Sequence, residues 1–381
     1  MTNLEIFDKA CERGHLTPCR AGSYWEGLEV LSQAIEQDTS ITPAFRENLT
    51  ELLITNLVAR LKVDDYIAAN PGVRQKTIHK PVIVFGLPRT GTTLVSHLLA
   101  TDPARRSLRH WEAAEPVPPA TTETLLSDPR CLRKHIAQEL LLALDPRLAR
   151  AHWEFAEDPT ECDSLLSQDF KSAHWAMLVP QYGNWLHACD MRPAYAHHKS
   201  VLQMLQAATH GRWNLKSTCH GLFIDTLQAT YPDVRMIWTH RDPFRAFAST
   251  CSLVRAQQAI LGAQVDSDVV RSSCEVYLTQ LLTRSLRANP QLSDGTVYHL
   301  WYNRLLQSPI EEMRELYRWL GDDFTPPVEE RMRSWLSAHP QAKYGKHQYS
   351  LAEFNIREST LPDIFHDYLT HFSIAREAPM A

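Results

Sequence analysis

The sequence lacks the features that mark several large classes of protein. No stretch approaches 18 consecutive apolar residues, so we expect no membrane span. The sequence contains no block of five or more basic residues, so it lacks the charge pattern of a nucleic-acid-binding protein. The first residues are acidic and too short of apolar side chains to form a secretory signal. We therefore expect a cytoplasmic protein without a nucleic-acid partner.

Closely spaced metal ligands are missing as well. The 8 cysteines are scattered along 381 residues and form no C-x-x-C pair. Dispersed cysteines in a chain of this length are typical of reduced thiols in a cytoplasm, most of which fill the core. The cysteine pattern therefore predicts neither disulfides nor a zinc site.

No long Gly/Ser linker and no internal repeat divides the chain. With 44% hydrophobic residues it can bury a large core. Residues 1–75 are predicted to be helical, because apolar positions recur at helical spacing in 27–36 and 49–61. Asn70-Pro71-Gly72 then breaks the pattern. We expect residues 76–381 to form a single domain.

Short apolar runs that alternate with helical patterns predict an α/β fold. Four runs are typical of strands, at 81–85, 213–215, 234–239 and 296–300. Helical patterns between them indicate a parallel sheet covered by helices on both faces. The stretch at about 120–205 is helical and rich in aromatic residues. We interpret it as a cap inserted over the mouth of the sheet, where it would form a pocket for a substrate.

A glycine-bounded loop is the most informative segment of the chain. The first predicted strand runs into Gly86-Leu87-Pro88-Arg89-Thr90-Gly91-Thr92-Thr93, and a helical pattern follows directly. Backbone N–H groups at such a helix start, together with the helix dipole, hold a phosphate or a sulfate. The P-loop of ATP and GTP enzymes reads G-x-x-x-x-G-K-[ST]. Here Thr92 replaces its lysine, and the cation is Arg89 inside the loop.

A second anion site is predicted at the next strand end. Arg241 closes the strand at 234–239, and Ser249 lies about two turns into the helix that follows. An arginine and a hydroxyl so placed can share one phosphate. Two anion sites at neighbouring strand ends match a nucleotide with phosphates at its 3′ and 5′ positions.

The loop resembles the 5′-phosphosulfate loop of sulfotransferases that use 3′-phosphoadenosine-5′-phosphosulfate (PAPS). From Pro81 to about Phe372 the chain is similar to the bacterial members of that family, which in turn resemble the tyrosylprotein sulfotransferases. The resemblance implies a P-loop-like fold and metal-independent transfer of a sulfuryl group from PAPS. The acceptor would be a hydroxyl of a small molecule, a lipid or a glycan. Besides the two anion sites, the resemblance rests on the segments 108–112, 161–166, 215–217, 302–309 and 345–354.

The same resemblance implies a role for each matching residue. Arg89 and the backbone of the next four residues would hold the 5′-phosphosulfate, and Arg241 with Ser249 would hold the 3′-phosphate. Lys216 would contact the transferred sulfuryl group, and Tyr302 would contact the adenine. A C-terminal loop would cover the 3′-phosphate. The four residues after Arg89 are Thr90, Gly91, Thr92 and Thr93, and the C-terminal loop contains Lys346 and His347.

The general base is predicted at Glu112. It follows the loop at about the distance at which tyrosylprotein sulfotransferases place their catalytic glutamate, and partial burial would raise its pKa toward neutrality. His110 is the rival, because animal cytosolic sulfotransferases use a histidine. His220 and His152 remain further alternatives.

Two other functions stay open on the sequence alone. A P-loop-like small-molecule kinase would need ATP and magnesium, and the residues at positions 89 and 92 argue against it. We also find no apolar strand ending in aspartate that would bind magnesium beside the loop. A catalytically silent nucleotide-binding protein of the same fold would keep both anion sites but lack the base.

Overall fold

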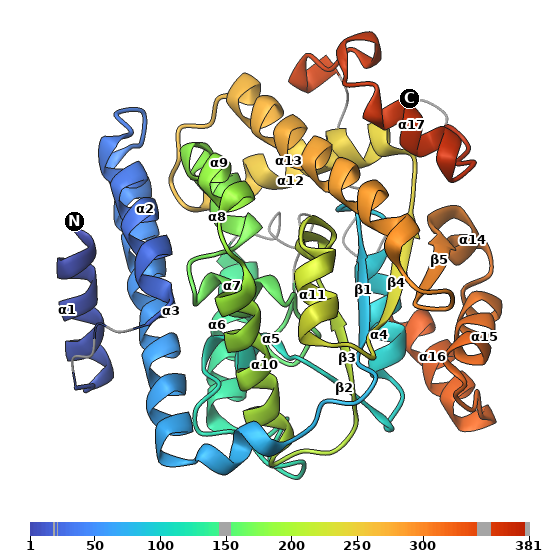
Figure 1. Cartoon of the computed structure of the whole chain (residues 1–381), viewed down its shortest axis with the longest axis horizontal. Coiled ribbons are helices and arrows are strands. Elements are labelled where there is room, and N and C mark those ends of the chain that lie inside the picture. The colour runs from blue at the N-terminus through green and yellow to red at the C-terminus, as the bar shows by residue number, and fades with distance from the viewer. Residues whose placement is uncertain (18–19, 21, 145–153, 341–351, 378–381) are drawn as a thin grey trace.

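The computed structural model describes residues 1–17, 20, 22–144, 154–340 and 352–377. At its centre lies a five-stranded parallel sheet with helices on both faces (Figure 1), which confirms the predicted α/β fold. The strand order is β2-β3-β1-β4-β5. The strands are β1 (Val82–Gly86), β2 (Arg105–Ser107), β3 (Arg212–Lys216), β4 (Arg235–His240) and β5 (Val297–Trp301).

The central strand shows why the sheet needs two helical layers. Val82 and Val84 belong to one hydrophobic cluster, with helices α4 (Thr92–Ala100), α14 (Tyr302–Gln307), α15 (Pro309–Leu320) and α16 (Pro326–Ala338). Ile83 and Phe85 point to the opposite face and belong to a second cluster. Because every position of β1 is buried, the strand carries a continuous apolar run, as expected for parallel sheets.

Four of the five strands match the predicted runs, and β2 was missed. Its sequence is Arg105-Arg106-Ser107, which contains no apolar side chain. This short edge strand pairs only with β3. Its arginines are nevertheless buried, since they lie against aromatic rings: the Arg105 guanidinium lies 5.3 Å from the Tyr317 ring centroid and that of Arg106 lies 4.3 Å from Trp213. Their charges are balanced by ion pairs, Arg105 with Asp322 and Arg106 with Glu112, and the cation–π contacts add to this.

Residues 1–75 are helical, as expected. They form α1 (Asn3–Gly14), α2 (Tyr24–Gln37), α3 (Pro43–Ala69) and the 3₁₀ turn η1 (Pro71–Gln75), which lie on the left in Figure 1. The long helix α3 begins where Thr42 accepts a hydrogen bond from the N–H of Phe45 and Pro43 takes the first helical position. Buried side chains of all three helices belong to the same cluster as Ile83 and Phe85. The division of the chain at residue 75 stays a prediction.

The segment at 120–205 contains five helices among its described residues, joined by loops. Its helices pack beside the sheet, and α10 runs along it toward β3 (Figure 1). The bounds are α6 (Pro129–Leu144), α7 (Asp163–Ser167), α8 (Ala173–Leu178), α9 (Pro180–Ala188) and α10 (Arg192–Gln206).

The remaining helices connect the strands and close the fold. They are α5 (His110–Ala114), η3 (Thr218–Leu222), α11 (Ile224–Thr230), α12 (Pro243–Ile260), α13 (Ser267–Ala288), η4 (Asn289–Gln291), η5 (Ala352–Phe354), η6 (Glu358–Thr360) and α17 (Ile364–His371).

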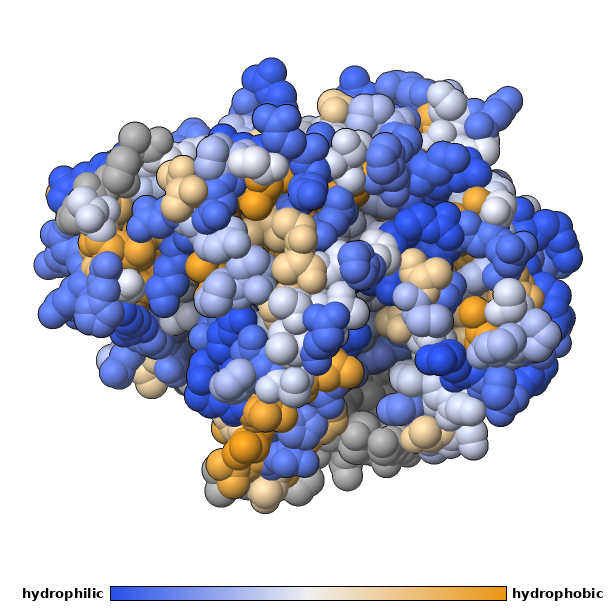
Figure 2. Space-filling view, turned by 90° about the horizontal axis from the view of Figure 1, so that it is seen from below, coloured by the Kyte–Doolittle hydropathy of each residue, from blue (hydrophilic) through white to orange (hydrophobic). Residues whose placement is uncertain are grey.

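Most of the face shown in Figure 2 is hydrophilic, with apolar side chains gathered on one projection. Exposed apolar side chains on α6 include Leu132, Ile136 and Leu140. Across the described residues, no helix has the length and apolar character needed to cross a bilayer. The cytoplasmic location stays a prediction.

Candidate active site

The loop after β1 is built as an anion cradle at the carboxyl edge of the sheet. Its end is set by Gly91, which caps α4 with a φ of 93°. Arg89 also has a left-handed backbone, with a φ of 69°. A Cβ atom on Gly91 would lie 2.9 Å from Cδ2 of Tyr302, so only glycine lets that ring approach the loop. The Thr90 hydroxyl hydrogen-bonds to the carbonyl oxygen of Leu87 and to the hydroxyl of Thr239 on β4, which ties the loop to its neighbour strand.

The two predicted anion sites meet in the structure. Nε of Arg89 donates a hydrogen bond to Oγ of Ser249 on α12 at 3.1 Å. Nη1 of Arg241 donates to the carbonyl oxygen of Arg89 at 2.9 Å. Arg241 is placed by β4, whose last residue it follows, and Asp242 then caps α12 by accepting from the N–H of Phe244. One charged edge therefore joins the ends of β1 and β4, where ligands bind in open parallel sheets.

Arg241 is held by two further groups. Its guanidinium carbon lies 4.4 Å from the centroid of the Tyr302 ring. Its Nε and Nη2 donate to the two carboxylate oxygens of Glu377, at 2.6 and 2.8 Å. Planar bidentate contact of this kind is how arginine also recognises phosphate. The carboxylate of Glu377 thus occupies the face of Arg241 that we expected a phosphate to use.

Lys216 lies at the end of β3 in a fully buried position and is flanked by carboxylates. Nζ donates to Glu154 at 2.7 Å and to Glu161 at 3.2 Å, and it approaches the Thr93 hydroxyl at 3.4 Å. Burial alone would lower the pKa of Lys216, but the two carboxylates outweigh it and raise the pKa above its usual value. Lys216 is therefore a permanent positive charge beside the loop.

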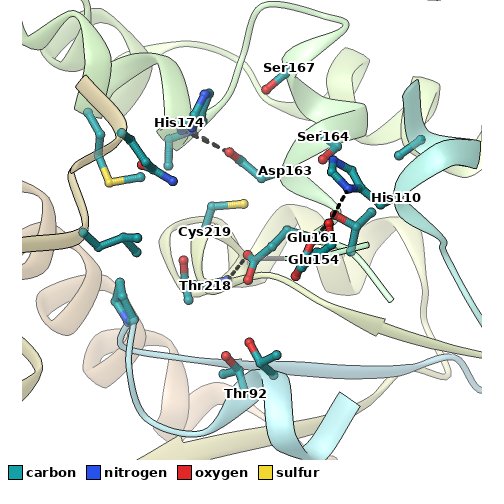
Figure 3. A pocket seen from close by; sticks show the side chains of 18 of the residues that line it. Thr92, His110, Glu154, Glu161, Asp163, Ser164, Ser167, His174, Thr218 and Cys219 are labelled. Atoms are coloured by element: carbon teal, nitrogen blue, oxygen red, sulfur yellow. Dashed lines mark hydrogen bonds between the residues drawn. The ribbon is translucent and has the colours of Figure 1, made fainter. Parts of the chain in front are cut away.

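The segment that carries both glutamates runs alongside the start of α5. The N–H of Thr160 donates to Leu108, and the N–H of His110 donates to Asp158, at 2.8 and 3.0 Å. Further on, Glu161 forms a parallel bridge with Lys216, whose backbone is already in the sheet. This pairing brings Glu154, Glu161 and His110 to one side of the cavity, above Thr92 of the loop in the view of Figure 3.

The carbonyl oxygen of Glu154 orients the His110 ring. It lies 3.2 Å from Nδ1 of His110 and accepts a second hydrogen bond from Nε2 of Gln138 at 2.8 Å. Nδ1 of His110 also lies 3.2 Å from Nε2 of Gln138, so the carbonyl oxygen and the amide together hold the ring in place from its Nδ1 side.

Glu112 lies elsewhere. It is fully buried, and its carboxylate accepts from Nη2 and Nη1 of Arg106 at 2.6 and 3.2 Å. It also accepts from the N–H of Arg109 at 3.4 Å, so that it caps α5. Glu112 is not among the residues that line the cavity. The distance along the chain matched the family pattern, but this carboxylate faces the buried arginine of β2.

A cavity of about 910 Å³ opens beside the loop. Its polar end is lined by residues of the loop and by Arg241, Tyr302, His110, Glu154 and Glu161. Helices α3, α5, α8 and α12 contribute apolar residues to its other walls, together with polar ones such as Asn56, His174 and Gln257. The apolar residues there are Leu52, Ala59, Ala113, Ala114, Ala173, Met177, Leu253 and Val254. The N-terminal helix α3 therefore contributes directly to the pocket, which the sequence did not predict.

Not every predicted site residue is described, and some of those that are described do not line the cavity. Lys346, His347 and His152 lie outside the described residues. Ser249, which is buried against Arg89, and the fully buried Lys216 are not cavity-lining residues, although each contacts a residue that lines it. His220 is fully buried, 2.8 Å from the hydroxyl of Tyr195. Glu154 was missed by the sequence analysis, and Glu161 was noted only as part of a matching segment. A buried lysine at a strand end was the signal that carboxylates had to lie near it.

Comparison with known proteins identifies related chains. The model of a family described as "Sulfotransferase family" matches residues 81–326. Two curated relatives, from Mycobacterium bovis and Mycobacterium tuberculosis, are both named omega-hydroxy-beta-dihydromenaquinone-9 sulfotransferase Stf3. Each is 26% identical over 302 residues, which cover 76% of this chain and 74% of the relative.

Two solved structures are similar over nearly the whole chain. Sulfotransferase STF9 from Mycobacterium avium superposes with a TM-score of 0.91 and 36% identity, covering 98% of this chain and 97% of the other. Sulfotransferase STF1 from Mycobacterium tuberculosis gives a TM-score of 0.84 and 27% identity, with 98% of both chains covered. The likeness includes the N-terminal helices, since it reaches well beyond the residues that the family model matches.

Proposed function

Because this chain belongs to the sulfotransferase family, we propose that it moves a sulfuryl group from PAPS to the hydroxyl of an apolar small molecule or lipid. The observation that supports this proposal is the cationic edge that Arg89 and Arg241 form at the ends of β1 and β4. Arg89 contacts Ser249, and Arg241 contacts the backbone of Arg89, beside a loop that has Thr92 where nucleotide kinases have lysine.

PAPS carries phosphate groups at both ends of its ribose, and the cationic edge offers a partner for each. Arg89 and the N–H groups of residues 90–93 would bind the 5′-phosphosulfate at the start of α4. Arg241 would bind the 3′-phosphate after Glu377 leaves it, with Ser249 close by. Tyr302 packs against both Gly91 and Arg241, which suits a side chain that contacts the adenine.

The transfer itself needs positive charge on both sides of the sulfur. The acceptor oxygen attacks sulfur and forms a new S–O bond, while the bond to the 5′-phosphate oxygen breaks and 3′,5′-adenosine diphosphate leaves. Arg89 would stabilise the negative charge that develops on the leaving phosphate. Lys216, held in its charged form by Glu154 and Glu161, would stabilise the sulfuryl oxygens. Since these two cations supply the charge, we propose a transfer that needs no metal.

For the general base we propose His110 in place of Glu112. His110 lines the cavity and is held from its Nδ1 side by Glu154 and Gln138, so the basic nitrogen that we propose is Nε2. The acceptor hydroxyl would give its proton to that nitrogen. Glu112 would need to release Arg106, with which it shares two hydrogen bonds, before it could act as a base.

The walls of the cavity indicate the class of acceptor. The apolar side chains of α3, α8 and α12 lie beyond the cluster of charged residues, so the pocket suits a hydroxyl carried on a mainly apolar molecule. The curated relatives are named for a menaquinone derivative that carries a hydroxyl group. Of the predicted classes, a small apolar molecule or a lipid therefore fits better than a glycan.

The experiment is a transfer assay with PAPS labelled with radioactive sulfur, with EDTA present. The acceptor panel contains hydroxylated isoprenoid quinones, long-chain alcohols, phenols and a free sugar as a polar control. We expect label in an apolar product with the intact chain and its loss in Lys216→Met. A parallel reaction replaces PAPS and EDTA with ATP labelled at its γ-phosphate and magnesium, and label that enters the product only in this reaction would contradict the proposal.

A further inference from the structure

Three side chains that the proposed transfer does not use meet in the core behind β3. Cys162 precedes α7, His198 lies on α10, and His220 lies in η3. One ligand atom from each lies within 4.8 Å of the other two. All three side chains are fully buried, and none lines the cavity. This is the one such cluster of metal-ligating residue types found across the described ranges.

Each of the two histidines has one ring nitrogen with a hydrogen-bond partner and one without. Nδ1 of His198 lies 2.7 Å from the hydroxyl of Tyr231, and Nδ1 of His220 lies 2.8 Å from the hydroxyl of Tyr195. The Nε2 atoms of both rings are buried and have no hydrogen-bond partner among the described residues. A buried polar atom without a partner costs about 1–3 kcal/mol. The thiol proton of Cys162 could satisfy only one of the two nitrogens.

We propose that Sγ of Cys162 and the Nε2 atoms of His198 and His220 bind one transition-metal ion of the zinc class. A thiolate and two imidazoles are the ligands that such borderline-soft ions prefer. The tyrosine hydroxyls on the opposite ring nitrogens match the second-sphere hydrogen bonds that orient metal-binding histidines. Bond lengths at zinc place neighbouring ligand atoms about 3.3–3.7 Å apart, so binding would draw the widest pair together by about 1 Å.

The binding step balances without a redox partner. The thiol of Cys162 gives its proton to solvent, the ion gives up water molecules, and three bonds form to the sulfur and the two ring nitrogens. Burial and the nearby carboxylates of Glu161 and Asp163 raise the pKa of this thiol, so it stays protonated when no cation is near. With a dication and the thiolate bound, the site carries a single positive charge, which the nearby Glu161 and Asp163 stabilise.

The position of the cluster suggests a structural role next to the active site. Cys162 directly follows Glu161, and its N–H donates to the carbonyl oxygen of Lys216 at 2.8 Å. His220 is in the turn that begins two residues after Lys216. An ion shared by these segments and α10 would fix the Glu161–Lys216 pair relative to the sheet. This metal would not take part in the transfer, and its presence does not depend on the proposed function.

The test measures metal directly in the full-length protein. The chain is expressed in zinc-supplemented medium and purified without chelator, and its metal content is determined by inductively coupled plasma mass spectrometry. We expect about one equivalent of zinc or copper per chain in the wild type. Cys162→Ala should lose most of it, while Cys274→Ala, another buried cysteine on α13, should keep it.

A second measurement keeps the test valid if the Cys162 variant does not fold. Wild-type chain unfolded with chelator and refolded with Co²⁺ should show the visible absorption of a thiolate-bound cobalt site, and excess Zn²⁺ should remove it. Wild-type protein with less than about one tenth of an equivalent of any transition metal, and with no such absorption, would overturn the proposal.

Discussion

Arg241 and Glu377 form a bidentate ion pair, with Nε–Oε1 and Nη2–Oε2 distances of 2.6 and 2.8 Å. The N–H of Glu377 and the side chain of the preceding Arg376 both donate to Asp242, which fixes this end of the chain against α12. If Arg241 binds the 3′-phosphate, this carboxylate must leave first. The C-terminal segment therefore competes with the donor for the same guanidinium.

Glu377→Gln is expected to strengthen the binding of 3′,5′-adenosine diphosphate. The side chain of Glu377 is 35% exposed, so the pair contributes only as much as a surface ion pair, and we expect about a two- to fivefold lower Kd. Calorimetric titration measures it. Glu358→Gln is the matched control, because Glu358 pairs with Arg376 and not with Arg241. Weaker binding by Glu377→Gln would mean that the carboxylate orients Arg241 for the ligand.

Lys216→Met is expected to lower kcat by about 10²–10³-fold, because it removes a positive charge from the transferred group. The Kd of the bisphosphate product should stay within about threefold of wild type, since that product has lost the sulfuryl group. Lys199→Met is the control: Lys199 lies over Tyr231 and donates to the Thr230 carbonyl oxygen, away from the cavity. If kcat and the affinity for the product fell equally, Lys216 would bind a phosphate group of the nucleotide and not the sulfuryl group.

His110→Gln is expected to lower kcat by about 10²–10⁴-fold, the range found when a general base is removed. Glutamine keeps a hydrogen-bonding side chain of similar length, so the affinity for the bisphosphate should not change. The acid limb of the kcat profile against pH should also disappear. A variant that keeps both its rate and its acid limb would move the role of base to another residue.

Glu112→Gln is expected to lower stability more than catalysis. The change leaves the guanidinium of Arg106 buried without its counter-charge, which costs about 3–5 kcal/mol. Urea unfolding of the variant and of Glu115→Gln, whose carboxylate pairs with Arg133 at the surface, gives the comparison. An unchanged unfolding midpoint together with loss of turnover would restore Glu112 as the base.

The fold could be predicted from the sequence because the central strands are apolar runs between helical patterns. Val82 to Phe85 had to be buried on both faces, and the glycine-bounded loop that follows defined an anion site from local sequence alone. The charged strand β2 could not be found in this way, since its burial depends on Asp322, Tyr317 and Trp213, which are distant in the sequence.

The site was only partly predictable for the same reason. Arg89 and Arg241 were predicted because strand ends of a parallel sheet converge, whereas Tyr302 was implied only by the family resemblance. Glu154 reaches Lys216 through the pairing of two loops, and Glu377 reaches Arg241 from the far end of the chain. No spacing rule expresses such contacts. The cluster of Cys162, His198 and His220 was missed likewise, because its members come from three separate elements.

The central claim is that the cationic edge binds a nucleotide with phosphates at both its 3′ and 5′ positions. Calorimetric titration of the wild-type chain with 3′,5′-adenosine diphosphate, AMP and ATP tests it most directly. We expect micromolar binding of the bisphosphate without magnesium, weakened at least about tenfold by Arg241→Ala, and far weaker binding of AMP. Binding of ATP alone, and only when magnesium is present, would contradict the account.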